Sequence, residues 1–158
     1  MPIWFQPIIF LIRRLMFDAL MGSSDISIFK EPCMKLRAIS IDDDPTSILM
    51  VKQLAEKIDN LELVNTYQDA VKGAAGIILD RPDVLFLDIE MPEFNGIEIM
   101  NSLIKPPKII VISGNPNFKE KALELKAVTF ISKPPGEEEF KKAVDKVRDI
   151  FNQELANA

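Results

Sequence analysis

The chain has 158 residues, of which 47% are hydrophobic and 27% charged, so the composition predicts one globular domain and excludes a disordered chain. The net charge of −5 lacks the basic excess that is typical of nucleic-acid-binding proteins. The absence of histidine excludes imidazole catalysis and a phosphohistidine of the chain's own. A single cysteine excludes an internal disulfide and favours a reducing, cytoplasmic compartment.

Residues 1–33 differ in composition from the rest and are predicted to be an N-terminal extension outside the folded domain. The apolar stretch 2–21 is interrupted by Arg13, Arg14 and Asp18, so a membrane-spanning helix is not expected. Its apolar residues fall on one helical face, which leaves a helix that binds a membrane surface or a partner as the less favoured alternative. The favoured interpretation is a mis-set start of the sequence or an incidental addition, with the domain itself spanning residues 34–155.

From Met34 onward, apolar runs with strand character alternate with helical patterns. Asp44 is predicted to cap the first helix, with Pro45 at its first position. The strands are expected at 36–41, 61–66, 84–87, 108–112 and 127–132. The helices are expected at about 45–58, 70–78, 97–103, 118–125 and 137–154. This fivefold alternation predicts an α/β fold with a doubly wound, five-stranded parallel sheet.

The second of these helices has the least certain pattern. The apolar residues Ala70, Val71, Ala74, Ile77 and Ile78 form the pattern that predicts this helix. Two glycines within the same stretch weaken the prediction, because glycine disfavours a helix interior.

Polar residues follow four of the five predicted strands. Asp42 and Asp43 follow the first strand, Asp88 the third, Ser113 the fourth and Lys133 the fifth. The carboxyl ends of parallel strands lie along one edge of a sheet, where open α/β folds build their sites. Adjacent carboxylates repel one another unless a cation joins them, and carboxylate oxygens suit Mg²⁺. A carboxylate at such a place can also accept a phosphoryl group as an acyl phosphate.

The stretch from Leu87 to Pro92, followed by Asn95-Gly96, has the pattern D-x-x-M-P-x-x-x-G that begins at Asp88. Together with Asp42-Asp43 and Lys133-Pro134, it resembles the receiver domain of two-component response regulators. The resemblance covers residues 34 to about 152 and implies a flavodoxin-like strand order 2-1-3-4-5. That order would place the two carboxylate-bearing strand ends side by side.

The resemblance also implies a role for each site residue. Asp88 would be the phosphoacceptor, and Ser113 and Lys133 would hold the phosphoryl oxygens, with a cis peptide bond before Pro134. The resemblance further implies an Mg²⁺ site formed by Asp42 through water, by Asp43 and Asp88 directly, and by the backbone carbonyl of Glu90. Phe130 would be the aromatic switch residue that turns inward when Ser113 moves, although a plain core role is equally well supported. The Glu90 side chain would tune hydrolysis of the acyl phosphate.

The implied partners are a histidine kinase or a histidine phosphotransfer protein, and a downstream protein target. No output domain follows the last predicted helix, so a stand-alone receiver similar to the chemotaxis type is expected, with no direct nucleic-acid binding and no catalysis beyond its own phosphorylation and dephosphorylation. The alternatives are a receiver cut from a longer protein and a receiver-like interaction module that works without phosphorylation. A haloacid-dehalogenase-type phosphatase is disfavoured, because the motif D-x-D-x-[TV] is not present at Asp88.

Overall fold

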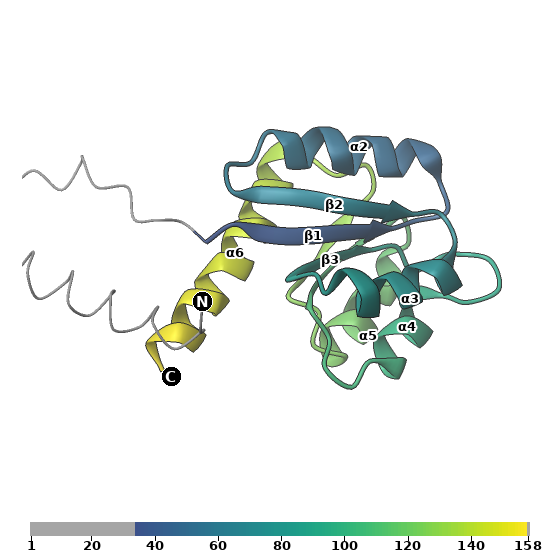
Figure 1. Ribbon diagram of the computed structural model, residues 1–158. Coiled ribbons are helices and arrows are strands. Elements are labelled where there is room, and N and C mark those ends of the chain that lie inside the picture. The colour runs from purple at the N-terminus through teal and green to yellow at the C-terminus, as the bar shows by residue number, and fades with distance from the viewer. Residues whose placement is uncertain (1–33, 158) are drawn as a thin grey trace, which may run out of the picture. The chain divides into compact units, whose positions relative to one another are not determined.

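The computed structural model describes residues 34–157 (Figure 1). The predictions for residues 1–33, including an amphipathic helix, fall outside these residues. The sheet contains β1 (Leu36–Ile41), β2 (Leu61–Tyr67), β3 (Val84–Leu87), β4 (Lys108–Ser113) and β5 (Thr129–Ser132). The strands are all parallel and lie in the order β2-β1-β3-β4-β5, which confirms the predicted fold and strand order.

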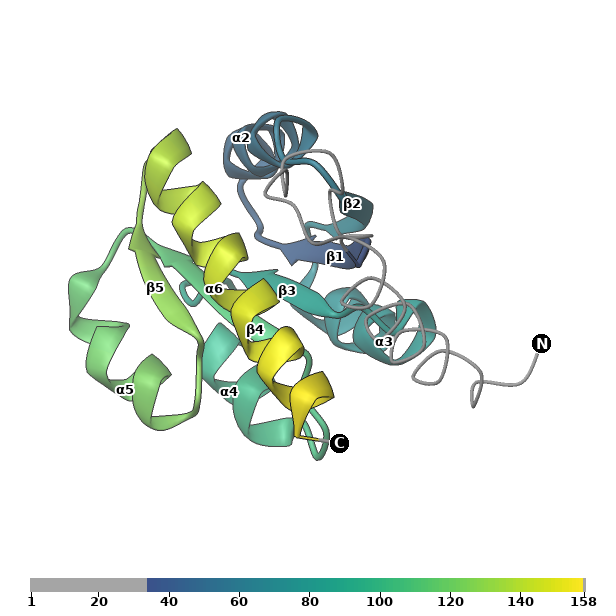
Figure 2. The same cartoon turned by 90° about the vertical axis from the view of Figure 1, so that its left-hand side faces the viewer.

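Helices cover both faces of the sheet (Figure 2). They are α2 (Pro45–Glu56), α3 (Ala70–Asp80), α4 (Gly96–Ser102), α5 (Lys119–Glu124) and α6 (Glu137–Ala156), with a 3-10 turn η3 (Pro116–Phe118) before α5. Side chains of α2 and α6 contribute to the core on one face of the sheet, and those of α3, α4 and α5 to the core on the other. Within residues 34–157, no helix is long and apolar enough to cross a membrane.

Strand β3 is the central strand of the sheet, and its four residues are all buried. Because successive strand residues point to opposite faces, Leu85 and Leu87 enter the core beneath α3, α4 and α5, whereas Val84 and Phe86 enter the core beneath α2 and α6. The ring of Phe86 stacks on that of Phe140 in α6, with centroids 4.7 Å apart. A strand that is apolar throughout is therefore explained by burial on both sides.

The segment between α5 and β5 differs from the prediction. Strand β5 begins at Thr129, two residues later than expected. Residues 126 and 127 instead end the helix, since Lys126 takes a positive φ of 67° and the Ala127 N–H donates to the carbonyl of Ala122 at 3.0 Å. Phe118, the first residue of the predicted helix 118–125, is likewise the last residue of η3. Because main-chain groups form these hydrogen bonds, the periodicity of the apolar side chains does not predict them.

The apolar residues that predict α3 do not all face the core. Val71 and Ile78 are 63% and 73% exposed, and the helix packs on the sheet through Ala70, Gly73, Gly76 and Ile77 instead. The two glycines are the points of closest approach. A Cβ on Gly73 would lie 2.7 Å from the Ile41 side chain, and one on Gly76 would lie 2.3 Å from the Tyr67 ring. The residues that weakened the helix prediction are therefore the ones that allow the helix to pack.

Replacing Gly76 with alanine is expected to destabilise the protein by about 1–3 kcal/mol, because the added methyl overlaps the ring of Tyr67. The ring cannot move freely, since its hydroxyl donates to Asp80 at 2.6 Å. Urea unfolding measures the change. Val71→Ala, on the exposed side of the same helix, should stay within about 0.5 kcal/mol of the wild type. Equal stabilities of Gly76→Ala and the wild type would contradict the close approach.

Candidate functional site

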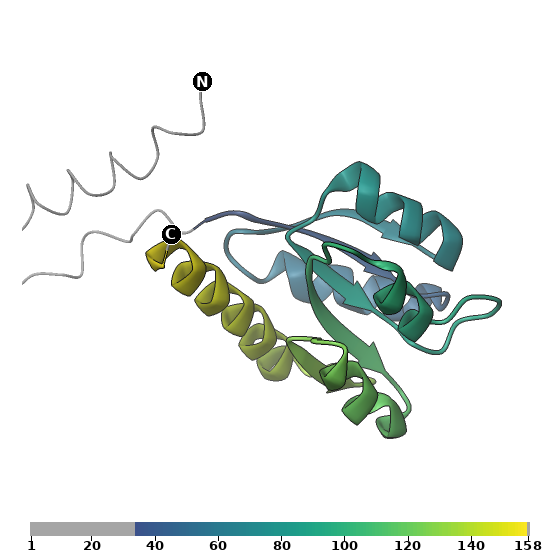
Figure 3. The ribbon, with the colours of Figure 1, turned by 90° about the horizontal axis from the view of Figure 1, so that it is seen from below.

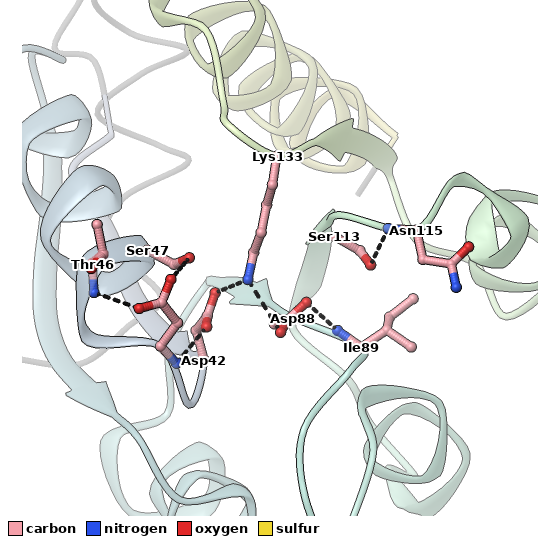
Figure 4. Close-up of polar contacts among 9 residues, drawn as sticks. Asp42, Thr46, Ser47, Asp88, Ile89, Ser113, Asn115 and Lys133 are labelled. Carbon is pink, nitrogen blue, oxygen red and sulfur yellow. Dashed lines mark hydrogen bonds and ion pairs between the residues drawn. The ribbon is translucent and has the colours of Figure 1, made fainter.

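The polar residues predicted at the strand ends meet at the carboxyl edge of the sheet (Figure 4). Strands β1 and β3 are neighbours, and the Asp88 N–H continues their ladder by donating to the carbonyl of Ile41 at 2.9 Å. This pairing sets Asp88 directly beside Asp42, which follows β1. The strand order alone therefore brings together two carboxylates that are 46 residues apart in the sequence.

Three carboxylates form an acidic cluster at this edge. Asp42, Asp43 and Asp88 each offer an oxygen, and these oxygens all lie within 4.8 Å of one another. Asp42 and Asp88 are buried, at 3% and 4% exposure, whereas Asp43 is exposed. Asp44 lies outside the cluster and caps α2, as predicted, by accepting hydrogen bonds at 2.9 Å from both the Thr46 N–H and the Ser47 hydroxyl.

Lys133 extends from the end of β5 into this cluster. Its Nζ lies 2.7 Å from an Asp42 oxygen and 3.2 Å from an Asp88 oxygen, so one ammonium bridges the two buried carboxylates (Figure 4). The Lys133–Pro134 peptide bond is cis, as the sequence resemblance implies. The Lys133 N–H also donates to the Ser113 carbonyl at 3.0 Å, which ties the ends of β4 and β5 together.

The burial of these charges shifts their pKa values. Burial raises the pKa of Asp88 above the usual carboxyl value, and the nearby Asp42 charge raises it further, against the opposing effect of Lys133. Burial by itself lowers the pKa of Lys133, but its hydrogen bond to Asp42 and the charges of Asp88 and Asp42 outweigh burial, and the pKa is raised. The lysine is therefore held in its charged form beside a carboxylate whose ionisation is costly.

The donor set fits a divalent cation of the Mg²⁺ type. Three ionised carboxylates carry a charge of −3, of which Lys133 offsets one unit, so a divalent ion would complete the neutralisation. Oxygen donors that include one or two carboxylates, with room for water, are typical of Mg²⁺ sites. The acidic cluster is thus of the kind that holds Mg²⁺.

Ser113 and Phe130 lie on neighbouring strands beside the cluster. Ser113 ends β4 and is fully buried, and its hydroxyl oxygen accepts a hydrogen bond from the Asn115 N–H at 3.3 Å. Phe130 in β5 is opposite Val111 of β4, is 8% exposed and belongs to the core beneath α3, α4 and α5. Its ring therefore lies inward in this structure, and its predicted role as a switch residue remains a prediction.

Asn115 is a site residue that the sequence did not predict. Besides its bond to Ser113, its side-chain amide donates to Glu90 Oε1 at 3.3 Å, and its Oδ1 accepts from the Asn117 N–H at 3.1 Å. Asn115 thus joins the loop after β3 to the loop after β4, next to Asp88. Asparagine before Pro116 is a helix-start signal, which could have identified the cap but not the contact with Glu90.

Gly96 holds the loop that follows Asp88. The loop ends at α4, where Asn95 and Glu98 form a capping box. A Cβ at Gly96 would lie only 2.3 Å from the Asp88 carbonyl oxygen and 2.9 Å from the Ile89 Cα. Because both of these atoms belong to the backbone, no side-chain rotation can relieve the overlap. Only glycine allows α4 to begin this close to Asp88.

Gly96→Ala is therefore expected to destabilise the protein by about 3 kcal/mol and to displace Asp88. Urea unfolding measures the first effect, and amide chemical shifts of residues 88–96 measure the second. Gly114→Ala serves as the control because a Cβ there meets nothing within 4 Å. If the two alanine variants were equally stable, the close approach at Gly96 would not be what fixes this loop.

Comparison with known proteins agrees with this geometry. The family model "Response regulator receiver domain" matches residues 38–145. The transcriptional regulatory protein LytR of Staphylococcus aureus (strain N315) is 29% identical over 126 residues, which are 78% of this chain and 51% of LytR. A protein-glutamate methylesterase/protein-glutamine glutaminase of Burkholderia thailandensis is 34% identical over 111 residues, which are 66% of this chain and 31% of that protein. The chain therefore spans about half the length of LytR and 31% of the length of the methylesterase.

Solved structures show the same fold. The response regulator domain of Thermotoga maritima CheB is similar with a TM-score of 0.65 and 26% identity, over 74% of this chain and 96% of that one. The receiver domain of the putative response regulator NarL of Mycobacterium tuberculosis has a TM-score of 0.66 and 26% identity, over 73% and 98% of the two chains. With its sheet order and acidic cluster, the chain belongs to the response regulator receiver domain family of two-component signalling.

Proposed function

We propose that this protein is a phosphoacceptor of a two-component phosphorelay and is phosphorylated on Asp88. The observation that carries the proposal is the contact of Lys133 with both Asp42 and Asp88, within a cluster of three carboxylates at the carboxyl edge of the sheet. The oxygens of a phosphoryl group bring new negative charge to the carboxylate that accepts it. An ammonium and a cation-binding site beside that carboxylate can stabilise this charge.

In the proposed transfer, an Asp88 carboxylate oxygen attacks the phosphorus of a phosphohistidine on the donor. The new O–P bond forms as the P–N bond to the imidazole breaks, and the imidazole leaves with the bonding pair. Mg²⁺ held by Asp42, Asp43, Asp88 and the Glu90 carbonyl would supply positive charge to the phosphoryl oxygens. Lys133 would hold a second phosphoryl oxygen. In a later step, water attacks the phosphorus, which releases inorganic phosphate and restores the Asp88 carboxylate.

The signal is proposed to pass through Ser113. Its hydroxyl accepts from the Asn115 N–H in the unphosphorylated protein, and it would turn to donate to a phosphoryl oxygen after transfer. That movement would change the packing at the end of β4, near Phe130 on the adjacent strand, whose ring already lies inward, and with it the surface of α5 and β5. The switch therefore couples one new hydrogen bond to a rearrangement of core packing.

The proposed donors are a histidine kinase or a histidine phosphotransfer protein, and the proposed receiver of the signal is a downstream protein, in the cytoplasm. These 158 residues contain no histidine, so the donor imidazole has to lie outside them. Catalysis is limited to the protein's own phosphorylation and dephosphorylation. The described residues follow the receiver pattern to the end of α6, and action through protein contact rather than by nucleic-acid binding agrees with the acidic net charge.

The test is the intact mass of the protein after incubation with a small-molecule phosphodonor, with and without Mg²⁺. We expect the gain of one phosphoryl group that requires Mg²⁺, is lost on standing, and is abolished by Asp88→Asn. Asp69→Asn is the control, because Asp69 only caps α3 and asparagine caps equally well. No gain from this donor or from a phosphorylated histidine phosphotransfer protein would contradict the proposal and favour an interaction module that works without phosphorylation.

A further inference from the structure

Glu90 lies in the loop that follows Asp88. The chain leaves β3 in this loop, which extends past the end of the sheet before α4 begins (Figure 3). The Met91 N–H donates to the Ile89 carbonyl at 3.1 Å, so Glu90 is the middle residue of a three-residue turn. Within residues 34–157, the main-chain carbonyl of Glu90 accepts no hydrogen bond, which leaves its oxygen available for the role of Mg²⁺ ligand that is proposed for it.

The Glu90 side chain forms a single hydrogen bond with the described part of the chain, and the donor is Asn115. The side-chain amide of Asn115 donates to Glu90 Oε1 at 3.3 Å. Glu90 is exposed, so packing does not fix its side chain. The orientation of Glu90 in the turn therefore depends on a residue that lies 25 positions further along the chain.

Asn115 is itself anchored at the end of the sheet (Figure 4). Its N–H donates at 3.3 Å to the hydroxyl of Ser113, which ends β4 and is fully buried. Its Oδ1 accepts from the Asn117 N–H at 3.1 Å and so caps η3. The Lys133 N–H in turn holds the Ser113 carbonyl, which joins the end of β4 to β5. Asn115 thus extends from a well-fixed strand end to the exposed turn at Glu90.

We propose, on the basis of the Mg²⁺ site in the proposed function, that Asn115 is a positioning residue for that site. It would act by holding Glu90, whose carbonyl is a proposed ligand. Residues outside a ligand set that hold a ligand in place typically contribute about 10- to 100-fold to metal affinity. Here we expect a smaller contribution, of at least about threefold, because the hydrogen bond is long and Glu90 is exposed. Asn115 also contacts Ser113, so one residue supports both the metal side and the hydroxyl side of the site.

The test compares two variants of Glu90 that have the same charge. Glu90→Gln and Glu90→Ala both remove the carboxylate, but only glutamine keeps a side-chain oxygen to which Asn115 can donate. Mg²⁺ alone is titrated into the ¹⁵N-labelled full chain, and the Kd is obtained from the amide shifts of Asp42, Asp43 and Asp88. We expect Glu90→Ala to bind Mg²⁺ at least about threefold more weakly than Glu90→Gln.

Asn115→Ser tests the other end of the same contact. Serine is as good a cap as asparagine, but it lacks the amide that reaches Glu90. This variant should bind Mg²⁺ at least about threefold more weakly than the wild type. In the Asn115→Ser background, Glu90→Gln and Glu90→Ala should bind Mg²⁺ equally, because the contact that distinguishes them is gone.

Asn117→Ala is the matched control for Asn115→Ser. Asn117 is an exposed asparagine two residues away, and its side chain forms no hydrogen bond with any residue in the range 34–157. Its replacement should leave the Kd for Mg²⁺ unchanged. An unchanged Tm in the absence of Mg²⁺ verifies that each variant is folded.

Three results would overturn the role of Asn115 while leaving the metal site itself intact. The first is an equal Kd for Glu90→Gln and Glu90→Ala in the otherwise wild-type chain. The second is a wild-type Kd for Asn115→Ser. The third is a double variant in which the losses from Glu90→Ala and Asn115→Ser multiply, because Asn115 would then act other than through Glu90. A wild type whose amides in the acidic cluster do not respond to Mg²⁺ would overturn both this role and the metal site of the proposed function.

Discussion

At the proposed Mg²⁺ site, replacing Asp43 with asparagine should abolish the stabilisation expected from the cation without weakening the metal-free fold. Asp43 is exposed and forms no ion pair with any residue in the range 34–157, so in the absence of a cation no direct contact offsets its repulsion by Asp42 and Asp88. With Mg²⁺ at 100 times its Kd, the wild type should gain about 2.7 kcal/mol of unfolding free energy, and the variant should gain almost nothing. Urea unfolding in EDTA and in Mg²⁺ measures both values.

Asp44→Asn is the control for this experiment. Asp44 is adjacent to Asp43 but caps α2 outside the acidic cluster, and asparagine is as good a cap as aspartate. This variant should keep the full response to Mg²⁺. If Asp43→Asn also kept it, the cation would have to be bound without Asp43, and the proposed ligand set would be wrong.

Replacing Lys133 with methionine should destabilise the metal-free protein by about 3–5 kcal/mol, because it leaves the buried carboxylates of Asp42 and Asp88 without a counter-charge. The two side chains are only 5% and 4% exposed, so solvent screens their charges little. Mg²⁺ should recover part of the loss, because the cation binds the same carboxylates. Chemical unfolding of the variant with and without Mg²⁺ measures the loss and the recovery.

Two further variants isolate the cause of that loss. Lys52→Met removes an exposed lysine from α2 and should change the stability by no more than about 0.5 kcal/mol. Adding Asp88→Asn to Lys133→Met should restore part of the stability, since one of the two unpaired charges is then gone. If the double variant were no more stable than Lys133→Met alone, lost packing of the lysine chain, rather than an unpaired charge, would account for the effect.

The site could be predicted from sequence because its residues sit at the ends of strands. Asp42, Asp88, Ser113 and Lys133 each follow an apolar run, and the parallel arrangement of those runs brings the ends to one edge. Local sequence also predicts the Asp44 cap, which needs only a side chain two or three residues from the N–H it accepts from. Asn115 was missed because its contact with Glu90 joins two loops that are 25 residues apart.

The sequence by itself determined the fold class, because apolar runs of strand length that alternate with helical periodicity can be buried together only in a layered α/β fold. It also determined which side chains carry charge at the strand ends. Only the tertiary structure decided which side of α3 is buried, since backbone contact at Gly73 and Gly76 outweighs the larger apolar area of Val71 and Ile78. The tertiary structure also decided that Lys133 bridges Asp42 and Asp88. The distances from its Nζ to the two carboxylates depend on the alignment of β1, β3 and β5 in one sheet.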